Sequence, residues 1–229
     1  MPALHEFADA ATLAAALCHH VVRRLKEDLA RQDRAVLVVS GGKSPVPLFK
    51  ALSQQPLAWD RVVITLADER WVPPGHADSN EALVRTHLLK HQAAEARLLA
   101  FWNGDPTPET GAAALCAGLA DLPRPFSQVI LGMGEDGHVA SLFPDAAELT
   151  DGLRTVAPAL AVRPAQAPHP RLSLSLAALL DSRDIALMLS GQAKRRVLER
   201  ALGGGAVEEL PVRAILRQTA TPVSVFWAA

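Results

Sequence analysis

The sequence predicts an α/β fold of the doubly wound, Rossmann-like kind: a mainly parallel sheet with helices on both faces and a small edge hairpin. Short runs rich in β-branched residues alternate with Ala- and Leu-rich segments that carry polar residues at helical spacing. The short runs are apolar throughout, which is typical of strands buried on both faces. Only one segment, residues 171–176, alternates strictly between polar and apolar side chains, and this pattern predicts a half-exposed strand in an edge hairpin.

The expected strands and helices follow one another along the chain. Buried strands are expected at residues 35–40, 61–66, 128–132, 184–190 and 222–227. Helices are expected at residues 8–32, 46–52, 79–91, 108–121 and 192–202. The proline-rich segment 157–170 is interpreted as an irregular surface connection, because the alternation resumes directly after it. The sequence therefore predicts a single α/β domain over residues 1–229.

The composition excludes several classes of protein. Hydrophobic residues make up 49% of the chain and charged residues 21%, which excludes a disordered or collagen-like protein. The 23 basic and 24 acidic residues leave a net charge of -1, so the chain has no excess basicity to hold a nucleic-acid backbone. Aromatic residues are only 4% of the chain, so platforms for stacking bases are not expected either.

The sequence also bears on location. No apolar run reaches the length of a membrane span, and the first ten residues lack the pattern of a signal peptide. Two cysteines, Cys18 and Cys116, make neither a disulfide framework nor a four-ligand zinc site, and they suit a reducing compartment. We therefore expect a cytoplasmic protein without nucleic-acid or membrane partners, present as a monomer or a weak homo-oligomer.

Ligands bind outside the carboxyl ends of parallel strands, so the residues that follow each expected strand are candidates for a site. The first strand is followed by Ser40-Gly41-Gly42-Lys43-Ser44-Pro45 and a helix. The glycines permit close approach of a ligand, Ser44 is a suitable N-cap, and the helix dipole together with Lys43 attracts an anion. The Walker spacing is missing. The segment is therefore either a phosphate-binding loop or a capped turn with an incidental lysine.

The third strand is followed by a glycine loop in which Gly132, Gly134 and Gly137 match the dinucleotide fingerprint. Pro144 leaves no room for the long helix of that motif, so a dinucleotide site is not predicted. The same loop presents Asp136 and His138, two residues apart, at an expected helix start. A carboxylate that orients or charges an imidazole suits general acid–base catalysis.

Other polar residues are ambiguous by themselves. The charges of Asp68-Glu69-Arg70 follow the second strand and indicate either a ligand site or a solvated cluster, while Arg171 and Lys194 taken singly resemble surface charges. His87 and His91 share a helix face, but neither the glutamate of a zinc-protease motif nor a third ligand accompanies them. No G-x-S-x-G motif is present. Neither a metal nor a cofactor is predicted.

Taken together, these segments resemble the glucosamine-6-phosphate isomerase/6-phosphogluconolactonase family over nearly the whole chain. The resemblance rests on residues 40–45, 67–72 with Ser79 and Asn80, 132–144, 171–174 and 191–194, and residues 132–144 are its most specific part. It implies a doubly wound α/β fold. It also implies hydrolysis of a sugar-phosphate lactone, 6-phospho-D-glucono-1,5-lactone, in the oxidative branch of the pentose phosphate pathway.

The resemblance also implies roles for individual residues. His138 is the expected general base, Asp136 orients and charges its ring, and Arg70 or loop N–H groups stabilise the oxyanion. Substrate and phosphate binding is expected at Ser40, Gly41, Gly42, Lys43, Ser44, Asp68, Arg171 and Lys194.

The sequence departs from the family's patterns at a few positions. Lys43-Ser44 stands where the lactonases often have Arg-Thr or Ser-Thr, and Val139 where Thr is common. The family's deaminases carry Tyr at the place of Arg70 and a catalytic Glu at the place of Phe143. A deaminase-like isomerase and a non-catalytic sugar-phosphate sensor are the alternatives.

Overall fold

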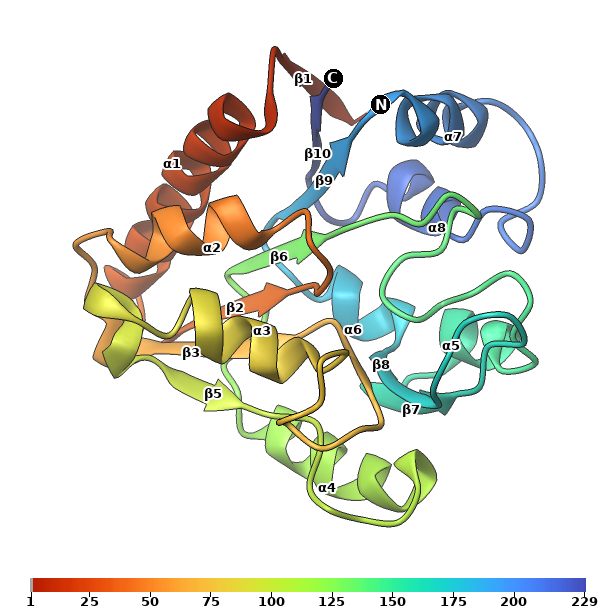
Figure 1. The fold of residues 1–229 in the computed structure, drawn as a ribbon, viewed down its shortest axis with the longest axis horizontal. Helices are drawn as coiled ribbons and strands as arrows, with labels where there is room; N and C mark the ends of the chain where they lie inside the picture. Colours follow the sequence, from red (N-terminus) through yellow and green to blue (C-terminus); the bar gives the residue numbers. More distant parts are fainter. Residues whose placement is uncertain (1) are drawn as a thin grey trace.

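The computed structural model describes residues 2–229 and contains a seven-stranded sheet in which all neighbouring strands are parallel. The strand order is β1-β10-β9-β6-β2-β3-β5 (Figure 1). The strands are β1 Ala3–Phe7, β2 Ala35–Val39, β3 Val62–Leu66, β5 Arg97–Leu99, β6 Gln128–Leu131, β9 Ile185–Ser190 and β10 Val223–Ala228. The chain proceeds from β2 to β3 and β5 on one side and returns to β6 on the other, so the topological switch point lies between β2 and β6. The predicted doubly wound parallel sheet is confirmed.

Helices cover both faces of this sheet. They are α1 Ala10–Leu29, α2 Val46–Ser53, α3 Asn80–His87, α4 Pro108–Ala120, α5 Leu149–Arg154, α6 Leu176–Leu180, α7 Gln192–Leu202 and α8 Val212–Arg217, with the 3-10 helices η1 Trp59–Arg61 and η2 His91–Glu95. In Figure 1, α1 and α2 lie together on one side of the strands, and α7 and α8 lie together on the other. Within α1, Leu13, Leu17, Val21 and Leu25 recur every four residues and are all buried, so one stripe of the helix packs on the sheet.

The boundaries of the predicted elements are mostly close to the observed ones. All five expected strands are present, and the helix expected at 8–32 begins at Ala10 because the Asp9 carboxylate accepts the N–H of Thr12 at 2.8 Å. The strands β1 and β5 were not predicted. β1 is an edge strand with four of its five residues exposed, so it has no apolar run, and β5 has only three residues.

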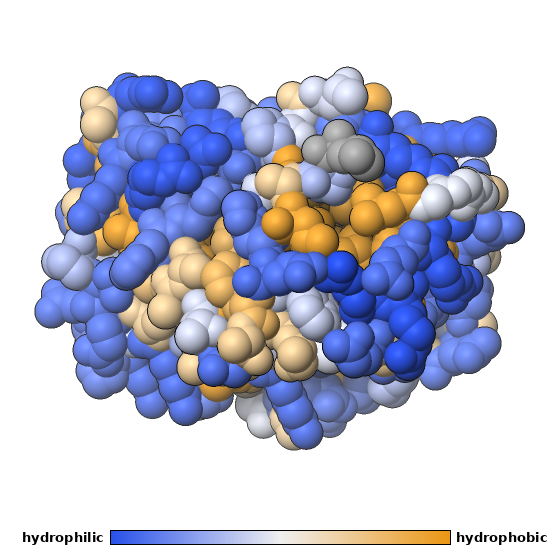
Figure 2. Space-filling model, turned by 90° about the horizontal axis from the view of Figure 1, so that it is seen from above, coloured by the Kyte–Doolittle hydropathy of each residue, from blue (hydrophilic) through white to orange (hydrophobic). Residues whose placement is uncertain are grey.

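The hydrophobic core is built from the central strands and the helix faces against them. Every residue of β2 and β3 is buried, and burying a Val, Leu or Ile side chain contributes about 1.5–3 kcal/mol. Figure 2 shows a face on which hydrophilic residues predominate around limited hydrophobic areas. In the part of the chain that the structure describes, no helix is long and apolar enough to cross a membrane.

A second, three-stranded antiparallel sheet lies beside the main one. It has the order β4-β8-β7, with β4 Asp68–Arg70, β7 Ala159–Val162 and β8 Arg171–Leu174. The expected hairpin corresponds to β7 and β8, but the prediction that its alternating strand is half-exposed was wrong. All four residues of β8 are buried: β4 and β7 pair with its two edges, and α4 packs against it. This pairing sets Arg70 opposite Arg171.

Candidate active site

A pocket of about 210 Å³ opens at the carboxyl ends of the central strands, where the switch point predicts a ligand site. Its lining comprises Ser40, Gly41, Gly42, Asp68, Arg70, Asn80, Gly132, Met133, Gly134, His138, Ala140, Arg171 and Lys194. These residues come from the loops after β2 and β6, from β4 and β8, and from the first turns of α3 and α7. The fold therefore brings together residues that are far apart in the sequence.

Most of the predicted site residues line this pocket, and three do not. Lys43 and Ser44 line an adjoining hollow, which shares Ser40, Gly41, Gly42, Gly132 and Lys194 with the main pocket. Asp136 is absent from both linings and contacts the ring of His138. The expected capping role of Ser44 was wrong: Pro45 occupies the N-cap position of α2, and no side chain caps that helix.

Asp136 and His138 form a hydrogen-bonded pair at the mouth of the pocket. Nδ1 of His138 lies 2.6 Å from Oδ1 of Asp136, and the same oxygen accepts the backbone N–H of His138 at 3.1 Å. Partial burial raises the pKa of Asp136, but the hydrogen bond and charge of His138 outweigh it and hold that pKa below its usual value. With the carboxylate ionised, Nδ1 carries the proton and Nε2 is left to accept one.

The loop that carries this pair is a turn, and the prediction that His138 begins a helix was wrong. The N–H of Gly134 donates to the carbonyl oxygen of His138 at 2.9 Å, and Gly137 adopts a φ of +80°, which turns the chain back. No helix follows before α5, so Gly132, Gly134 and Gly137 do not form a dinucleotide-binding motif. Gly134 is instead required by the Asp136–His138 pair, because a Cβ on it would lie 2.2 Å from Nδ1 of His138.

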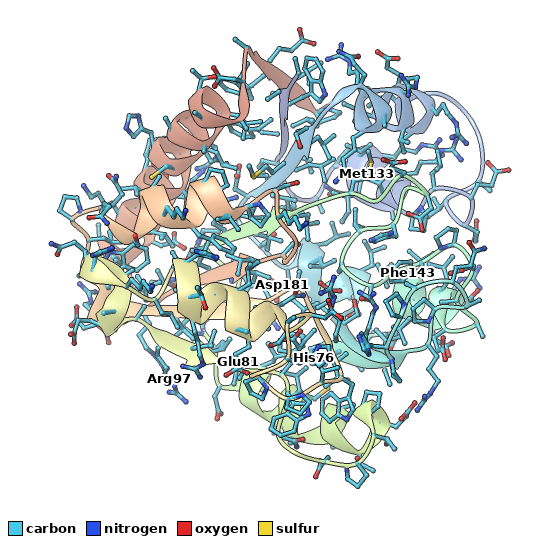
Figure 3. All side chains as sticks on the ribbon, viewed as in Figure 1. His76, Glu81, Arg97, Met133, Phe143 and Asp181 are labelled. Atoms are coloured by element: carbon cyan, nitrogen blue, oxygen red, sulfur yellow. The ribbon has the colours of Figure 1, made fainter. Side chains whose placement is uncertain are left out.

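Phe143 packs against the imidazole of His138. Its ring centroid lies 4.0 Å from that of His138, and only 5% of the residue is exposed. The guanidinium of Arg171 lies 5.0 Å from the same aromatic ring. Figure 3 labels Phe143 and Met133, which both belong to the long connection after β6. The sequence comparison of Phe143 with the deaminase glutamate gave no indication of this stacking.

The two arginines of the pocket owe their positions to the small sheet. Nη1 of the buried Arg171 lies 3.5 Å from Oδ2 of Asp68, and this oxygen also accepts the hydroxyl of Ser141 at 2.5 Å. Burial lowers the pKa of Arg171, and the Asp68 carboxylate opposes the shift. Arg70 is half-buried, and its Nη1 donates to the carbonyl oxygen of Asp78 at 2.5 Å. Asp68 therefore holds Arg171 as well as lining the pocket.

Glu69 and Asn80 support the site, and the sequence patterns include both residues without assigning either of them a role. The buried Glu69 carboxylate accepts the N–H groups of Arg70 at 2.8 Å, Asn80 at 2.8 Å and Glu81 at 2.7 Å. Burial raises its pKa to about 7, although these N–H groups oppose the shift. The Asn80 side chain donates to the carbonyl oxygen of Asp68 at 2.8 Å and fills the space where a Cβ of Gly41 would lie. The acidic residue Glu69 shortly after β3 and the expected helix beginning near Asn80 are the sequence features that could have identified these two residues.

The third cationic side chain that lines the pocket is that of Lys194. Lys194 lies in the first turn of α7, where burial lowers its pKa and the carboxylate of Glu135 opposes the shift. Gly42 has a φ of +89°, and the hydroxyl of Ser40 donates to the carbonyl oxygen of Ile130 at 3.1 Å, which ties the loop after β2 to β6. The pocket thus combines three cationic side chains, Arg70, Arg171 and Lys194, with the imidazole of His138.

Potential metal ligands lie elsewhere. Among residues 2–229, one group of three histidine, cysteine or acidic side chains is arranged closely enough to hold an ion: His76, Asp78 and His169. None of the three lines the pocket. The pair His87 and His91 is not part of such a group.

Comparison with known proteins agrees with this arrangement. A sequence model of the family described as glucosamine-6-phosphate isomerases/6-phosphogluconolactonase matches residues 8–227. A 6-phosphogluconolactonase from Pseudomonas putida is 42% identical over 229 residues, covering 98% of this chain and 92% of the relative. The crystal structure of a 6-phosphogluconolactonase from Shewanella baltica OS155 has a TM-score of 0.99 at 43% identity and covers 100% of this chain and 98% of that one.

A monomeric glucosamine-6-phosphate deaminase also has this fold, with a TM-score of 0.81 at 17% identity, and covers 99% of this chain and 97% of its own. At that identity the likeness concerns the fold alone. The family match spans nearly all of the sequence, and the matches to the relatives above 40% identity cover more than nine-tenths of each relative's length. The chain therefore belongs to the glucosamine-6-phosphate isomerase/6-phosphogluconolactonase family.

Proposed function

We propose that this chain hydrolyses 6-phospho-D-glucono-1,5-lactone to 6-phospho-D-gluconate, in the oxidative branch of the pentose phosphate pathway. The names of the relatives above 40% identity support an enzyme that hydrolyses a lactone. The observation that carries the proposal is the Asp136–His138 pair, which lies at the edge of a pocket with three cationic side chains, Arg70, Arg171 and Lys194. The substrate has a phosphate that the cations can bind and a carbonyl carbon that a water molecule deprotonated by the base can attack.

In the proposed reaction, Nε2 of His138 takes a proton from a water molecule as the water oxygen attacks the lactone carbonyl carbon. Asp136 keeps the Nδ1 proton in place and stabilises the imidazolium that forms. Arg70 or N–H groups of the pocket loops stabilise the oxyanion. The carbonyl then re-forms, the bond to the ring oxygen breaks, and the imidazolium returns its proton to that oxygen. The scheme uses no cofactor, no metal and no covalent intermediate.

The phosphate is proposed to bind between the loop after β2 and the cations of the pocket. Gly41 and Gly42 both line the pocket, and a Cβ on Gly42 would meet no atom within 4 Å, so the backbone is open to a ligand there. Arg171 and Lys194 supply the charge. Lys43 is exposed and lines the adjoining hollow, so it is the outermost of the proposed ligands, with Ser40 and Ser44 completing the loop. Asp68 carries negative charge, so its role is to hold Arg171 and accept a substrate hydroxyl.

The alternative activity within the family, deamination of glucosamine 6-phosphate, is less well supported by this site. Phe143 stands where the deaminases have their catalytic glutamate, and its ring packs on His138. A phenyl ring cannot transfer a proton in the opening of a sugar ring. A non-catalytic sensor would have no need for a histidine held at 2.6 Å by a carboxylate.

We further propose that residues 1–229 act as one lactonase domain in the cytoplasm, as a monomer or a weak homo-oligomer. The near-neutral charge of the chain supports a small-molecule substrate and gives no attraction to nucleic acid.

The proposal is tested by steady-state kinetics of three variants, with circular dichroism to verify the fold. His138→Ala should lose roughly 10²–10⁴-fold in kcat, the usual worth of a positioned general base. His138→Asn keeps a similar size but accepts no proton at neutral pH, so it should be nearly as inactive. Asp136→Asn should lose less, because its role is to orient the ring. If His138→Asn keeps its turnover while Asp136→Asn is inactive, the carboxylate is the base and the two roles are reversed.

A further inference from the structure

Three potential metal ligands converge from two loops beside the pocket. His76 and Asp78 lie between β4 and α3, and His169 lies two residues before the start of β8. Nε2 of His169 is 3.0 Å from Oδ2 of Asp78, and Nδ1 of His76 is 3.7 Å from the same oxygen. The donor atoms all lie within 4.8 Å of one another. Figure 3 labels His76 on the loop before α3.

These separations suit a tetrahedral metal. Zinc binds imidazole nitrogen and carboxylate oxygen at about 2.0–2.2 Å, so two ligand atoms on a tetrahedral ion lie about 3.3–3.6 Å apart. The distances of 3.0 and 3.7 Å from the Asp78 oxygen bracket this value. Two imidazoles with one carboxylate also favour a late first-row transition metal over calcium or magnesium, which prefer oxygen ligands.

We propose that His76, Asp78 and His169 form a binding site for a divalent transition metal of the zinc class, with water in the fourth position. The site goes beyond the proposed hydrolysis, which needs none of these three side chains.

The backbone of both loops supports this arrangement. His169 adopts a φ of +68°, a left-handed conformation that is uncommon for residues other than glycine, and this conformation is part of the geometry that directs Nε2 to Asp78. The next residue is anchored, because the N–H of Trp71 donates to the carbonyl oxygen of Pro170 at 2.7 Å. The histidine rings lie 5.3 Å apart in a T-shaped arrangement.

Two existing hydrogen bonds have to give way. The N–H of Asp78 donates to Nδ1 of His76 at 3.1 Å, and a metal would take the lone pair that accepts this bond. Nε2 of His169 and Oδ2 of Asp78 share a hydrogen bond of 3.0 Å, and the metal would replace its proton. His76 and Asp78 are exposed, so water replaces the acceptor that the N–H of Asp78 loses.

The position of the site gives a bound ion a structural effect on the pocket. Arg70 donates to the carbonyl oxygen of Asp78, and Arg171 follows His169 by two residues. An ion held by Asp78 and His169 would cross-link the loops that adjoin these two arginines. It would hold them in place without touching the substrate.

The test is calorimetric titration of EDTA-stripped, desalted full-length protein with Zn²⁺, comparing the wild type with His169→Asn and His91→Asn. Asparagine tolerates the left-handed backbone, so His169→Asn removes the imidazole with little strain. His91 is the matched control, because it is also a histidine with a positive φ (+50°) and belongs to no ligand group.

The wild type and His91→Asn should bind one Zn²⁺ with equal affinity. His169→Asn should lose more than the roughly 10–100-fold that removal of an outer-shell partner costs. Zinc at about 100 times its Kd should raise the Tm of the wild type by about 5–10 °C and leave that of His169→Asn nearly unchanged. No binding by the wild type would overturn the proposal, and so would equal binding by His169→Asn, which would place the ion elsewhere, for example on His138.

This test is independent of the lactonase proposal. Zinc binding is measured without substrate, and the activity of the stripped enzyme is assayed separately in EDTA. A protein that binds zinc at this site but does not hydrolyse the lactone would support the metal site and refute the proposed function. A protein that hydrolyses the lactone but does not bind zinc at this site would support the proposed function and refute the metal site.

Discussion

Substitution of Gly134 tests whether the Asp136–His138 pair needs a residue without a Cβ atom at this position. A Cβ at this position would lie 2.2 Å from Nδ1 of His138 and 2.4 Å from Oδ1 of Asp136, whereas ordinary van der Waals contact begins at 3.4 Å. In Gly134→Ala both groups must therefore retreat by about 1 Å. A displacement of this size costs about 10²-fold in rate when it moves a group out of its productive geometry. We expect Gly134→Ala to lose about that factor in kcat.

The stability of the same variant should change little. The backbone of Gly134 has no positive φ, so alanine is not strained there, and the methyl group displaces side chains at the mouth of a pocket and none in the core. Gly204→Ala is the control, because a Cβ there meets no atom within 4 Å. The assay is lactone hydrolysis above the spontaneous rate, followed by proton release, with thermal unfolding to monitor the fold. Near-wild-type kcat in Gly134→Ala would refute the claim that this pair is held in its catalytic position by close packing on the glycine.

Three further predictions concern the substrate and the chemistry. Unphosphorylated gluconolactone should show a kcat/KM lower by about 10²–10⁴-fold, because two charge-assisted contacts worth about 1.5–3 kcal/mol each are lost; comparable efficiency on both lactones would contradict the assigned anion site. Hydrolysis should persist in EDTA, because the proposed base is an imidazole; activity that a chelator removes and a divalent ion restores in His169→Asn, which lacks a ligand of the proposed metal site, would contradict the mechanism. Glucosamine 6-phosphate should release no ammonia, because Phe143 replaces the deaminase acid; measurable deamination would overturn that assignment.

The sequence predicted the parts of the fold that depend on local pattern. The strands β2, β3, β6, β9 and β10 are continuous apolar runs, and such runs are stable only when both faces are covered. The sequence also predicted the contact between Asp136 and His138, because side chains two residues apart in a tight glycine turn lie close to each other. The edge strand β1 escaped prediction because most of its residues face solvent and carry no apolar signal.

The tertiary structure decided everything that depends on pairing between distant segments. Nothing in the sequence around Arg171 shows that β8 lies between β4 and β7, and this pairing buries the strand and sets Arg171 against Asp68. The stacking of Phe143 on His138 and the approach of His169 to Asp78 depend in the same way on how separate loops pack. Periodicity and turn residues report the interactions of a residue with its chain neighbours. The register of paired strands and the contacts between loops arise from packing across the whole molecule, which no local pattern encodes.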